Sequence, residues 1–274
     1  MPAFLAGGGM PFWIDLMTTD IRKASSFYAQ VAGWDIKEIS ADRRLARVAG
    51  MPVAGIVQQP EDAQLPDTWV LYFLADDLDA QVEEVNSLGG RVLAPPTEIS
   101  TGRMALLVDA AGAIFGLIEP TTEEAFIAAG EPGTPVWHEL TAISDYPRAV
   151  EFYSALLEWD FRSLEGVPGM NYTTALAEGA PFAGIWDAAG AFDQSLPNFW
   201  QSYIGVADID AAVAAAAEKG EVIREPWESE FGRMALVADP MGAVVTLCQV
   251  DPPVEEGHEG DPLAGVDLSE YGIS

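Results

Sequence analysis

The strongest constraint on this chain is an internal repeat, because short strings from its first half recur in the same order in its second half. Residues 102–106, Gly-Arg-Met-Ala-Leu, recur unchanged as residues 232–236. Chance matches would not keep both order and spacing, so we expect two copies of one module in tandem. The other matched strings include Phe27-Tyr28 with Phe152-Tyr153, Trp34-Asp35 with Trp159-Asp160, and Ala54-Gly55-Ile56 with Ala183-Gly184-Ile185.

The repeat also sets the expected module boundaries. Residues 10–120 are predicted to form the first module and residues 135–250 the second, and a chain of 274 residues is long enough for two cores. Residues 121–134 form a Pro/Gly-containing linker, in which we expect a short helix over residues 123–129. Residues 1–10 are typical of a flexible leader, and residues 251–274 form an acidic tail.

The charge excludes some partners. Asp and Glu number 43 against 13 Lys and Arg, a formal net charge of −30. No basic stripe is present, so nucleic acid and anionic membrane surfaces are excluded as partners. No apolar run is long enough to cross a bilayer, and the predicted location is the cytoplasm. The single cysteine, Cys248, forms no intrachain disulfide and is expected to be a buried thiol.

Hydrophobic periodicity predicts two βαβββ units in each module. In the first module, a strand over residues 12–18 precedes a helix over 21–31, and strands follow at 35–40, 44–49 and 53–58. The same order returns as a strand at 69–75, a helix at 78–88 and strands at 92–94, 104–108 and 114–118. Helices segregated from short strands indicate the α+β class. The expected helix N-caps are Asp20, Asp77, Asp145 and Asp208.

This doubled pattern resembles the vicinal oxygen chelate superfamily, which includes glyoxalase I, extradiol dioxygenases and bleomycin-resistance proteins. The resemblance rests on the Asp-x6-Phe-Tyr string at residues 20–28 and 145–153 and on Asp-Pro-Met-Gly-Ala at 239–243. Within this superfamily, the chain resembles above all the two-module glyoxalase-like proteins of actinobacteria. It implies that each module folds into a cupped, mostly antiparallel mixed sheet with its helices outside. The two modules are expected to pack as a pseudo-dimer within one monomeric chain, since fusion raises their effective concentration.

Metal-dependent members of this superfamily hold a divalent ion in the cup with His, Gln and Glu ligands. The matching positions here are Trp13, Val70 and Gly116 in the first module, and Trp137, Gln201 and Thr246 in the second. The fourth strand adds only Gln58, Gln59 and Asp187 as polar candidates. A divalent cation needs several converging nitrogen or oxygen donors, so no metal site and no cofactor are predicted.

Alternation along the strands predicts what the cups contain instead, since residues two apart share a face. Each cup is expected to hold an indole, a carboxylate and a tyrosine, which is a usual form of small-molecule site. The carboxylate favours a ligand with an amine, a cation or a hydroxyl; the alternative is that the tryptophans plug a core. The predicted ligand-binding residues are Trp13, Asp15, Tyr72, Trp137, Glu139, Gln201, Tyr203 and Thr246.

Three functions remain open. The first is a metal-free protein that binds a small hydrophobic or aromatic molecule. The second is a metal-dependent enzyme, a lyase of the lactoylglutathione lyase type or a dioxygenase, with Zn, Ni or Fe. The third is a non-catalytic interaction protein whose cups are filled by its own side chains. By strand parity, His138 points away from Glu139 and is expected under the helices or in solvent. Arg103 and Arg233 could anchor an anion, but a neighbouring carboxylate is the favoured partner for each.

Overall fold

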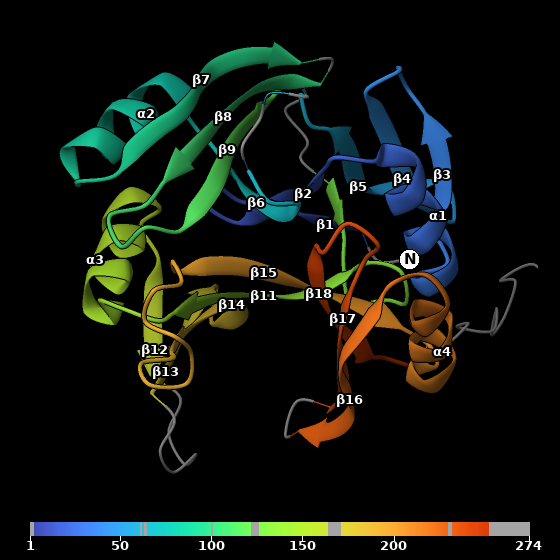
Figure 1. Cartoon of the computed structure of the whole chain (residues 1–274). Helices are drawn as coiled ribbons and strands as arrows, with labels where there is room; N and C mark the ends of the chain where they lie inside the picture. Colours follow the sequence, from blue (N-terminus) through green and yellow to red (C-terminus); the bar gives the residue numbers. More distant parts are fainter. Residues whose placement is uncertain are drawn as a thin grey trace, which may run out of the picture.

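The computed structural model describes residues 3–60, 62, 65–99, 101–121, 126–163, 171–229 and 232–251. Two curved sheets with helices alongside them make up the molecule (Figure 1). Each sheet has eight strands and contains two βαβββ units, so the predicted α+β fold with tandem modules is confirmed. The predicted acidic tail, apart from Asp251, lies outside the described residues.

The first sheet has the strand order β3-β4-β5-β2-β6-β9-β8-β7. Strand β2 pairs in parallel with β5, and β6 with β9, while the remaining neighbours are antiparallel. The predicted mixed, mostly antiparallel sheet is therefore confirmed. Its elements are β2 (Pro11–Thr18), α1 (Ile21–Val31), β3 (Asp35–Glu38), β4 (Arg43–Val48), β5 (Met51–Gln58), β6 (Thr68–Leu74), α2 (Leu78–Ser87), β7 (Arg91–Ile99), β8 (Gly102–Val108) and β9 (Ile114–Pro120).

The second sheet repeats this order as β12-β13-β14-β11-β15-β18-β17-β16. Its parallel pairs, β11 with β14 and β15 with β18, occupy the same places as those of the first sheet. Its elements are β11 (Pro135–Ala142), α3 (Tyr146–Leu156), β12 (Asp160–Ser163), β13 (Tyr172–Ala177), β14 (Ala180–Asp187), β15 (Phe199–Val206), α4 (Ile209–Lys219), β16 (Glu221–Ser229), β17 (Gly232–Ala238) and β18 (Val244–Gln249).

Three of the four helices begin as predicted. The carboxylates of Asp20, Asp77 and Asp208 each accept backbone N–H bonds from the first turn of α1, α2 and α4. The prediction for Asp145 is wrong, because this residue has a left-handed backbone (φ 53°) and makes no side-chain cap bond. A proline in the first turn of α3 lacks an N–H, so fewer orphan donors need a cap there.

The segments outside the modules depart from expectation. Strand β1 (Ala3–Leu5) pairs antiparallel with β10 (Phe126–Ala128). The predicted linker helix is therefore wrong at residues 126–128, and its first residues, 123–125, lie outside the described part. The flexible leader is wrong for residues 3–5, which form a strand. Both strands are short, and only their mutual pairing defines them, so hydrophobic periodicity gave no signal.

Strand β7 is longer than the predicted 92–94 because it tolerates Pro95 and Pro96. It lies at the edge of its sheet, where a missing N–H leaves no neighbour unpaired. The pairing of β7 with β8 shifts register between Ala94 and Thr97, where the prolines lie. The edge position, which the sequence does not show, therefore decides the length of this strand.

The two modules share one hydrophobic core. The back of each sheet, together with its helices, contributes to a single buried cluster that runs through both modules. Phe73 of the first module has its ring against Tyr153, Trp159 and Trp200 of the second, with centroids 5.2–6.0 Å apart. Helix α1 packs beside α4, and α2 beside α3 (Figure 1). The two modules thus pack as a pseudo-dimer within the chain, through the backs of their sheets and their helices.

The tryptophan of each repeated Trp-Asp dipeptide forms a hydrogen bond to the opposite module. Trp34 donates its indole N–H to the carbonyl of Gly133 (2.6 Å), and Trp159 donates to that of Gly9 (2.9 Å). Each glycine precedes the first strand of the opposite module and has a positive φ, 76° for Gly9 and 83° for Gly133. The reciprocal bonds explain why both dipeptides occur at matched positions. No helix among the described residues is long and apolar enough to cross a membrane.

Candidate functional site

The inner face of the first cup centres on a buried acid on β2. Asp15 is 1% exposed and accepts bonds from the indole N–H of Trp13 (2.7 Å) and from Arg43 (3.1 Å). Burial raises the pKa of Asp15, and the guanidinium of Arg43 partly offsets this. Asp15 therefore has its polar partners within the protein.

Glycines let these side chains occupy the cup. A Cβ at Gly55 would lie 2.0 Å from a carboxylate oxygen of Asp15, and one at Gly184 would lie 2.0 Å from the hydroxyl of Tyr172. These glycines are the central residues of the repeated Ala-Gly-Ile string. The string is repeated because each module places a polar side chain against the backbone at this point of its central strands.

Tyr72 fills the centre of the first cup. A Cβ at Gly116, the paired residue on β9, would lie 1.9 Å from the ring of Tyr72. Tyr72 is 3% exposed, and burial raises the pKa of its hydroxyl well above its ordinary value, helped by the nearby Asp15. The tyrosine ring therefore occupies the space that any larger residue at position 116 would need.

A cavity of about 830 Å³ opens in front of this layer. Its walls are mainly apolar and come from β2, β4, β5, β7, β8 and β9 of the first module and from β11 of the second, with Trp13, Leu45, Met51, Met104 and Ile118 among them. This volume lies within the range of small-molecule sites. The polar groups on its walls are Ser40, Arg43, Thr101, Thr121 and His138.

Of the predicted ligand-binding residues, Trp13 lines this cavity. Asp15 and Tyr72 share the cup face with it, but Asp15 lies behind Trp13 and Arg43 and is bonded to both. The charged group at the cavity wall is therefore a guanidinium, Arg43, and not the carboxylate expected there. Although Arg43 is paired with Asp15, its guanidinium has further N–H groups, so the wall carries hydrogen-bond donors at the place where a carboxylate was expected.

His138 reaches the cavity from the second module. Strand parity correctly turns it away from Glu139, onto the back face of β11 that Leu140 shares, and at the end of this face it meets the cavity of the first module. Its Nδ1 is 2.8 Å from the hydroxyl of Ser202, and its side chain contributes to the cavity wall. Burial lowers the pKa of His138 to about 3, so the imidazole is neutral at pH 7.

In the second cup, polar side chains form a hydrogen-bond network around Glu139. Gln201 donates to Glu139 (3.1 Å) and accepts from the hydroxyl of Thr246 (3.1 Å). Burial raises the pKa of Glu139, while hydrogen bonds from Tyr172, Tyr203 and Gln201 lower it. Trp137 donates to the Tyr172 hydroxyl (2.8 Å). The structure thus brings all the predicted residues of this cup together, and they bond one another.

The residues at the family's metal positions do not fit a divalent ion. In the first cup, Trp13 and Val70 offer no ligand atom for a hard cation, and the ring of Tyr72 covers Gly116. In the second, Gln201 has Glu139 and Thr246 as partners. Among the described residues, no group of three His, Cys, Asp or Glu is arranged to hold a metal ion. The fourth-strand candidates have other partners: Gln58 accepts from Ile21, Gln59 donates to Met17, and Asp187 accepts from Asn171.

The remaining candidates have structural roles. Arg103 forms a bidentate pair with Asp79, and Arg233 forms the same pair with Asp210. These pairs explain why the repeated Gly-Arg-Met-Ala-Leu string contains an arginine. Cys248 is buried with a free thiol, as expected, and burial raises its pKa.

Sequence reasoning missed Arg43 and Tyr172, the partners of the two buried acids. Both begin the strand next to Ala-Gly-Ile, where Arg43 pairs with Val57 and Tyr172 with Trp186. The predicted strand began one residue too late, at residue 44, and so left Arg43 in a turn. Alternation from Leu45 on β4 would have placed Arg43 on the cup face.

Comparisons with known proteins agree with this geometry. Residues 12–118 match a family described as glyoxalase-like domain, and residues 138–247 match the glyoxalase/bleomycin resistance protein/dioxygenase superfamily. The chain is 34% identical over 255 residues to "Putative glyoxylase CFP32" of Mycobacterium tuberculosis, covering 89% of this chain and 96% of that protein. It is 30% identical over 275 residues to the anthracycline biosynthesis protein DnrV of Streptomyces peucetius, covering 93% and 96%.

Solved structures show the same fold at low sequence identity. A Mn(II)-bound glyoxalase from Novosphingobium aromaticivorans has a TM-score of 0.60 at 16% identity, covering 91% of this chain and 85% of that one. The 2,2',3-trihydroxybiphenyl 1,2-dioxygenase of Sphingomonas wittichii has a TM-score of 0.60 at 13% identity, covering 92% and 95%. Two cupped βαβββ modules and relatives aligned along nearly the whole chain lead to one assignment: the protein belongs to the glyoxalase/bleomycin resistance/dioxygenase superfamily.

Proposed function

We propose that this protein binds a small aromatic molecule in the cavity of the first cup, without a metal ion. The observation that carries the proposal is the mainly apolar cavity of about 830 Å³, which has one guanidinium, that of Arg43, in its wall. Apolar walls and the Trp13 indole suit a flat, hydrophobic ring system. Arg43 suits an oxygen acceptor on that ring, such as a phenolate, a carboxylate or a quinone carbonyl.

His138 adds a second polar contact to this site. The neutral imidazole can donate or accept one hydrogen bond at the cavity, since its Nδ1 is held by Ser202. A ligand with oxygens at two edges would contact Arg43 of the first module and His138 of the second. The similarity to a protein named for anthracycline biosynthesis supports polycyclic hydroxyquinones as the first compounds to test.

The test is a fluorescence titration with a planar hydroxyquinone, such as an anthracycline aglycone. We expect saturable quenching of tryptophan emission in the wild-type protein and weaker binding in Arg43→Met. Arg44→Met is the matched control, because Arg44 pairs with the exposed Glu38 instead of lining the cavity. Equal loss of affinity in both variants would show nonspecific binding of the compound and contradict the proposal.

The alternative of a metal-dependent lyase or dioxygenase is tested separately. Elemental analysis of protein purified without a histidine tag should find less than one divalent transition-metal ion per chain. Dialysis against a chelator should leave hydroxyquinone binding unchanged. One tightly held Zn, Ni, Mn or Fe per chain would overturn the metal-free proposal and favour the enzymatic alternative.

A further inference from the structure

A break in the pseudo-symmetry lies at the junction between the modules. Each module has a turn, after β8 or β17, that begins with a buried aspartate, Asp109 or Asp239. In both turns one carboxylate oxygen accepts two backbone N–H bonds from within the turn. The second carboxylate oxygen is directed out of each turn, and its surroundings differ.

At Asp109 the second oxygen is satisfied by the other module. The hydroxyl of Tyr153 donates to it at 2.9 Å. The matching tyrosine of the first module, Tyr28, accepts a bond from Trp69, but its hydroxyl makes no hydrogen bond to Asp239. Asp239 is 3% exposed, and its buried Oδ2 has no hydrogen-bond partner among the residues that the structure describes. A buried carboxylate oxygen without a partner costs free energy, and in folded proteins such a group commonly has a water or an ion beside it.

The residue facing each turn also differs between the modules. Asn198, which directly precedes β15, donates its amide N–H to the carbonyl of Ala111 in the Asp109 turn (3.0 Å). The matching residue before β6 is Asp67, which has no N–H to donate. Asp67 is half-buried and accepts bonds from the hydroxyls of Thr18 and Thr19. Where one junction has an amide donor, the matched junction therefore has a carboxylate, Asp67, in addition to that of Asp239.

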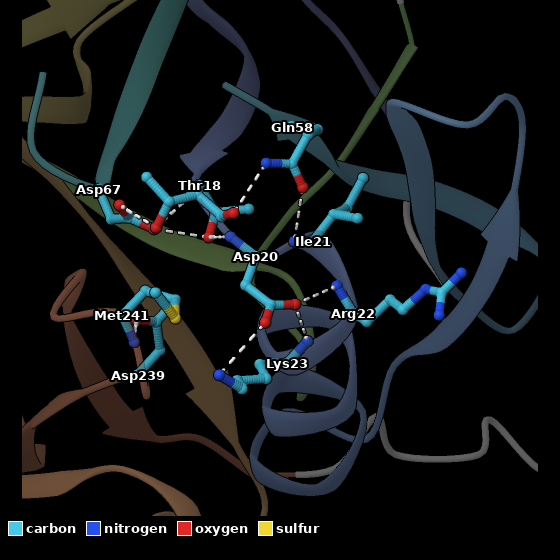
Figure 2. Close-up of polar contacts among 10 residues, drawn as sticks. Thr18, Asp20, Ile21, Arg22, Lys23, Gln58, Asp67, Asp239 and Met241 are labelled. Carbon is cyan, nitrogen blue, oxygen red and sulfur yellow. Dashed lines mark hydrogen bonds and ion pairs between the residues drawn. The ribbon is translucent and has the colours of Figure 1, made fainter. Parts of the chain in front are cut away.

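Figure 2 shows the 239–241 turn next to Asp67, near the start of α1. Burial raises the pKa of Asp239, and the negative charge of the neighbouring Asp67 raises it further. The nearby Lys23 is paired with Asp20. Within the described part of the chain, no lysine or arginine forms an ion pair with Asp67 or Asp239.

We propose that Asp67 and Asp239 together bind a hard cation of the Ca²⁺ class at the junction of the two modules. The groups at this place are oxygens, which Ca²⁺ prefers over nitrogen or sulfur. The carbonyl of Met241 corresponds to the Ala111 carbonyl that Asn198 contacts, so it is the expected neutral ligand. At the Asp239 turn, a cation would take the place that the amide of Asn198 and the hydroxyl of Tyr153 have at the Asp109 turn. Because the two carboxylates belong to different modules, the cation would cross-link them.

The test is calcium titration of chelator-treated full-length protein at constant ionic strength, by calorimetry and by thermal unfolding. We expect a saturable heat with one site per chain and a melting temperature that rises with free Ca²⁺ above the dissociation constant. Constant ionic strength is essential, because a chain of charge −30 gains stability from any screening salt.

Asp67→Asn is the decisive variant, since it installs the residue that the other module uses. We expect it to lose the calcium heat and to melt, without calcium, at least as high as the metal-free wild type. Asp239→Asn keeps the oxygen that caps its turn and should also lose the heat. Glu83→Gln removes one exposed charge on α2 and should respond as the wild type does. No saturable response in the wild type, or an equal response in Asp67→Asn, would overturn the proposal.

Discussion

At matched positions, the buried acids of the two cups have partners of different charge. In the first cup a cation, Arg43, pairs with Asp15. In the second cup a neutral hydroxyl, that of Tyr172, stands at the position of Arg43 and bonds Glu139. The difference leaves the first cup with a charged group in the wall of a large cavity and the second with a network closed on itself. One fold repeated within one chain has thus diverged into two chemical environments.

Removal of the acid's partner should give the largest difference between the cups. Arg43→Met leaves the carboxylate of Asp15 buried without a counter-charge, and we expect a loss of about 3 kcal/mol in the free energy of unfolding. Tyr172→Phe leaves Glu139 its bonds from Gln201 and Tyr203, so a loss of about 1 kcal/mol is expected. Urea unfolding at neutral pH measures both. Equal losses would mean that the charged and the neutral partner stabilise the two acids to the same extent.

The centres of the cups should differ by a smaller amount. Gly116→Ala forces a methyl group into the ring of Tyr72, and overpacking of this kind costs about 2 kcal/mol. Thr246→Ala at the matched position removes one hydrogen bond, to Gln201, and should cost about 1 kcal/mol. Unfolding curves of the two variants give the comparison. A Gly116→Ala protein as stable as the wild type would show that Tyr72 does not fill this space.

The two modules also differ at the back of their first sheet strands, β2 and β11. In β11, His138 is paired with Ser202, whereas in β2 the matched Ile14 is paired with Leu71. The pKa of His138 falls from 6.5 to about 3 on folding. A lowered pKa of a base gives stability that is complete above pH 6.5 and is lost as the pH falls towards 3. The loss is at most about 1.4 kcal/mol per pH unit.

His138→Gln keeps a polar side chain that cannot titrate, so it should unfold with a weaker dependence on pH in this window. The free energies of unfolding of the wild type and the variant should therefore converge as the pH falls from 6.5 towards 4. Parallel pH curves would contradict the assignment of a neutral imidazole with a lowered pKa. The second histidine, His258, is common to both proteins and cancels in the comparison.

The sequence predicts features that depend on neighbouring residues better than contacts between residues far apart in the chain. Helix α1 was predicted with its observed limits, because an N-cap and an apolar stripe are local signals. Strand parity correctly put Trp13 and Tyr72 on one face. The partner of Asp15 was missed because Arg43 lies on another strand, in contact only through the fold. His138 at the cavity was missed because that wall comes from the other module.

The smallest expected effect concerns the two indoles. If an aromatic ligand stacks on Trp13, Trp13→Leu should weaken binding by about 1 kcal/mol, the usual size of an aromatic pair. Trp137→Leu should leave the affinity unchanged, because Trp137 is bonded to Tyr172 in the second cup. Both are measured by the quinone titration, with tyrosine excitation or calorimetry as a second readout. Loss of affinity in Trp137→Leu alone would place the ligand in the other cup.

The central claim is that the ligand binds in the first cup, beside Arg43, and not in the second. Calorimetric stoichiometry with the tightest aromatic ligand tests it most directly, in the wild type, Arg43→Met and Tyr172→Phe. We predict one ligand per chain in the wild type, the same stoichiometry and affinity in Tyr172→Phe, and much weaker binding, with most of the heat lost, in Arg43→Met. Two ligands per chain in the wild type, or heat that survives Arg43→Met and disappears in Tyr172→Phe, would contradict this account.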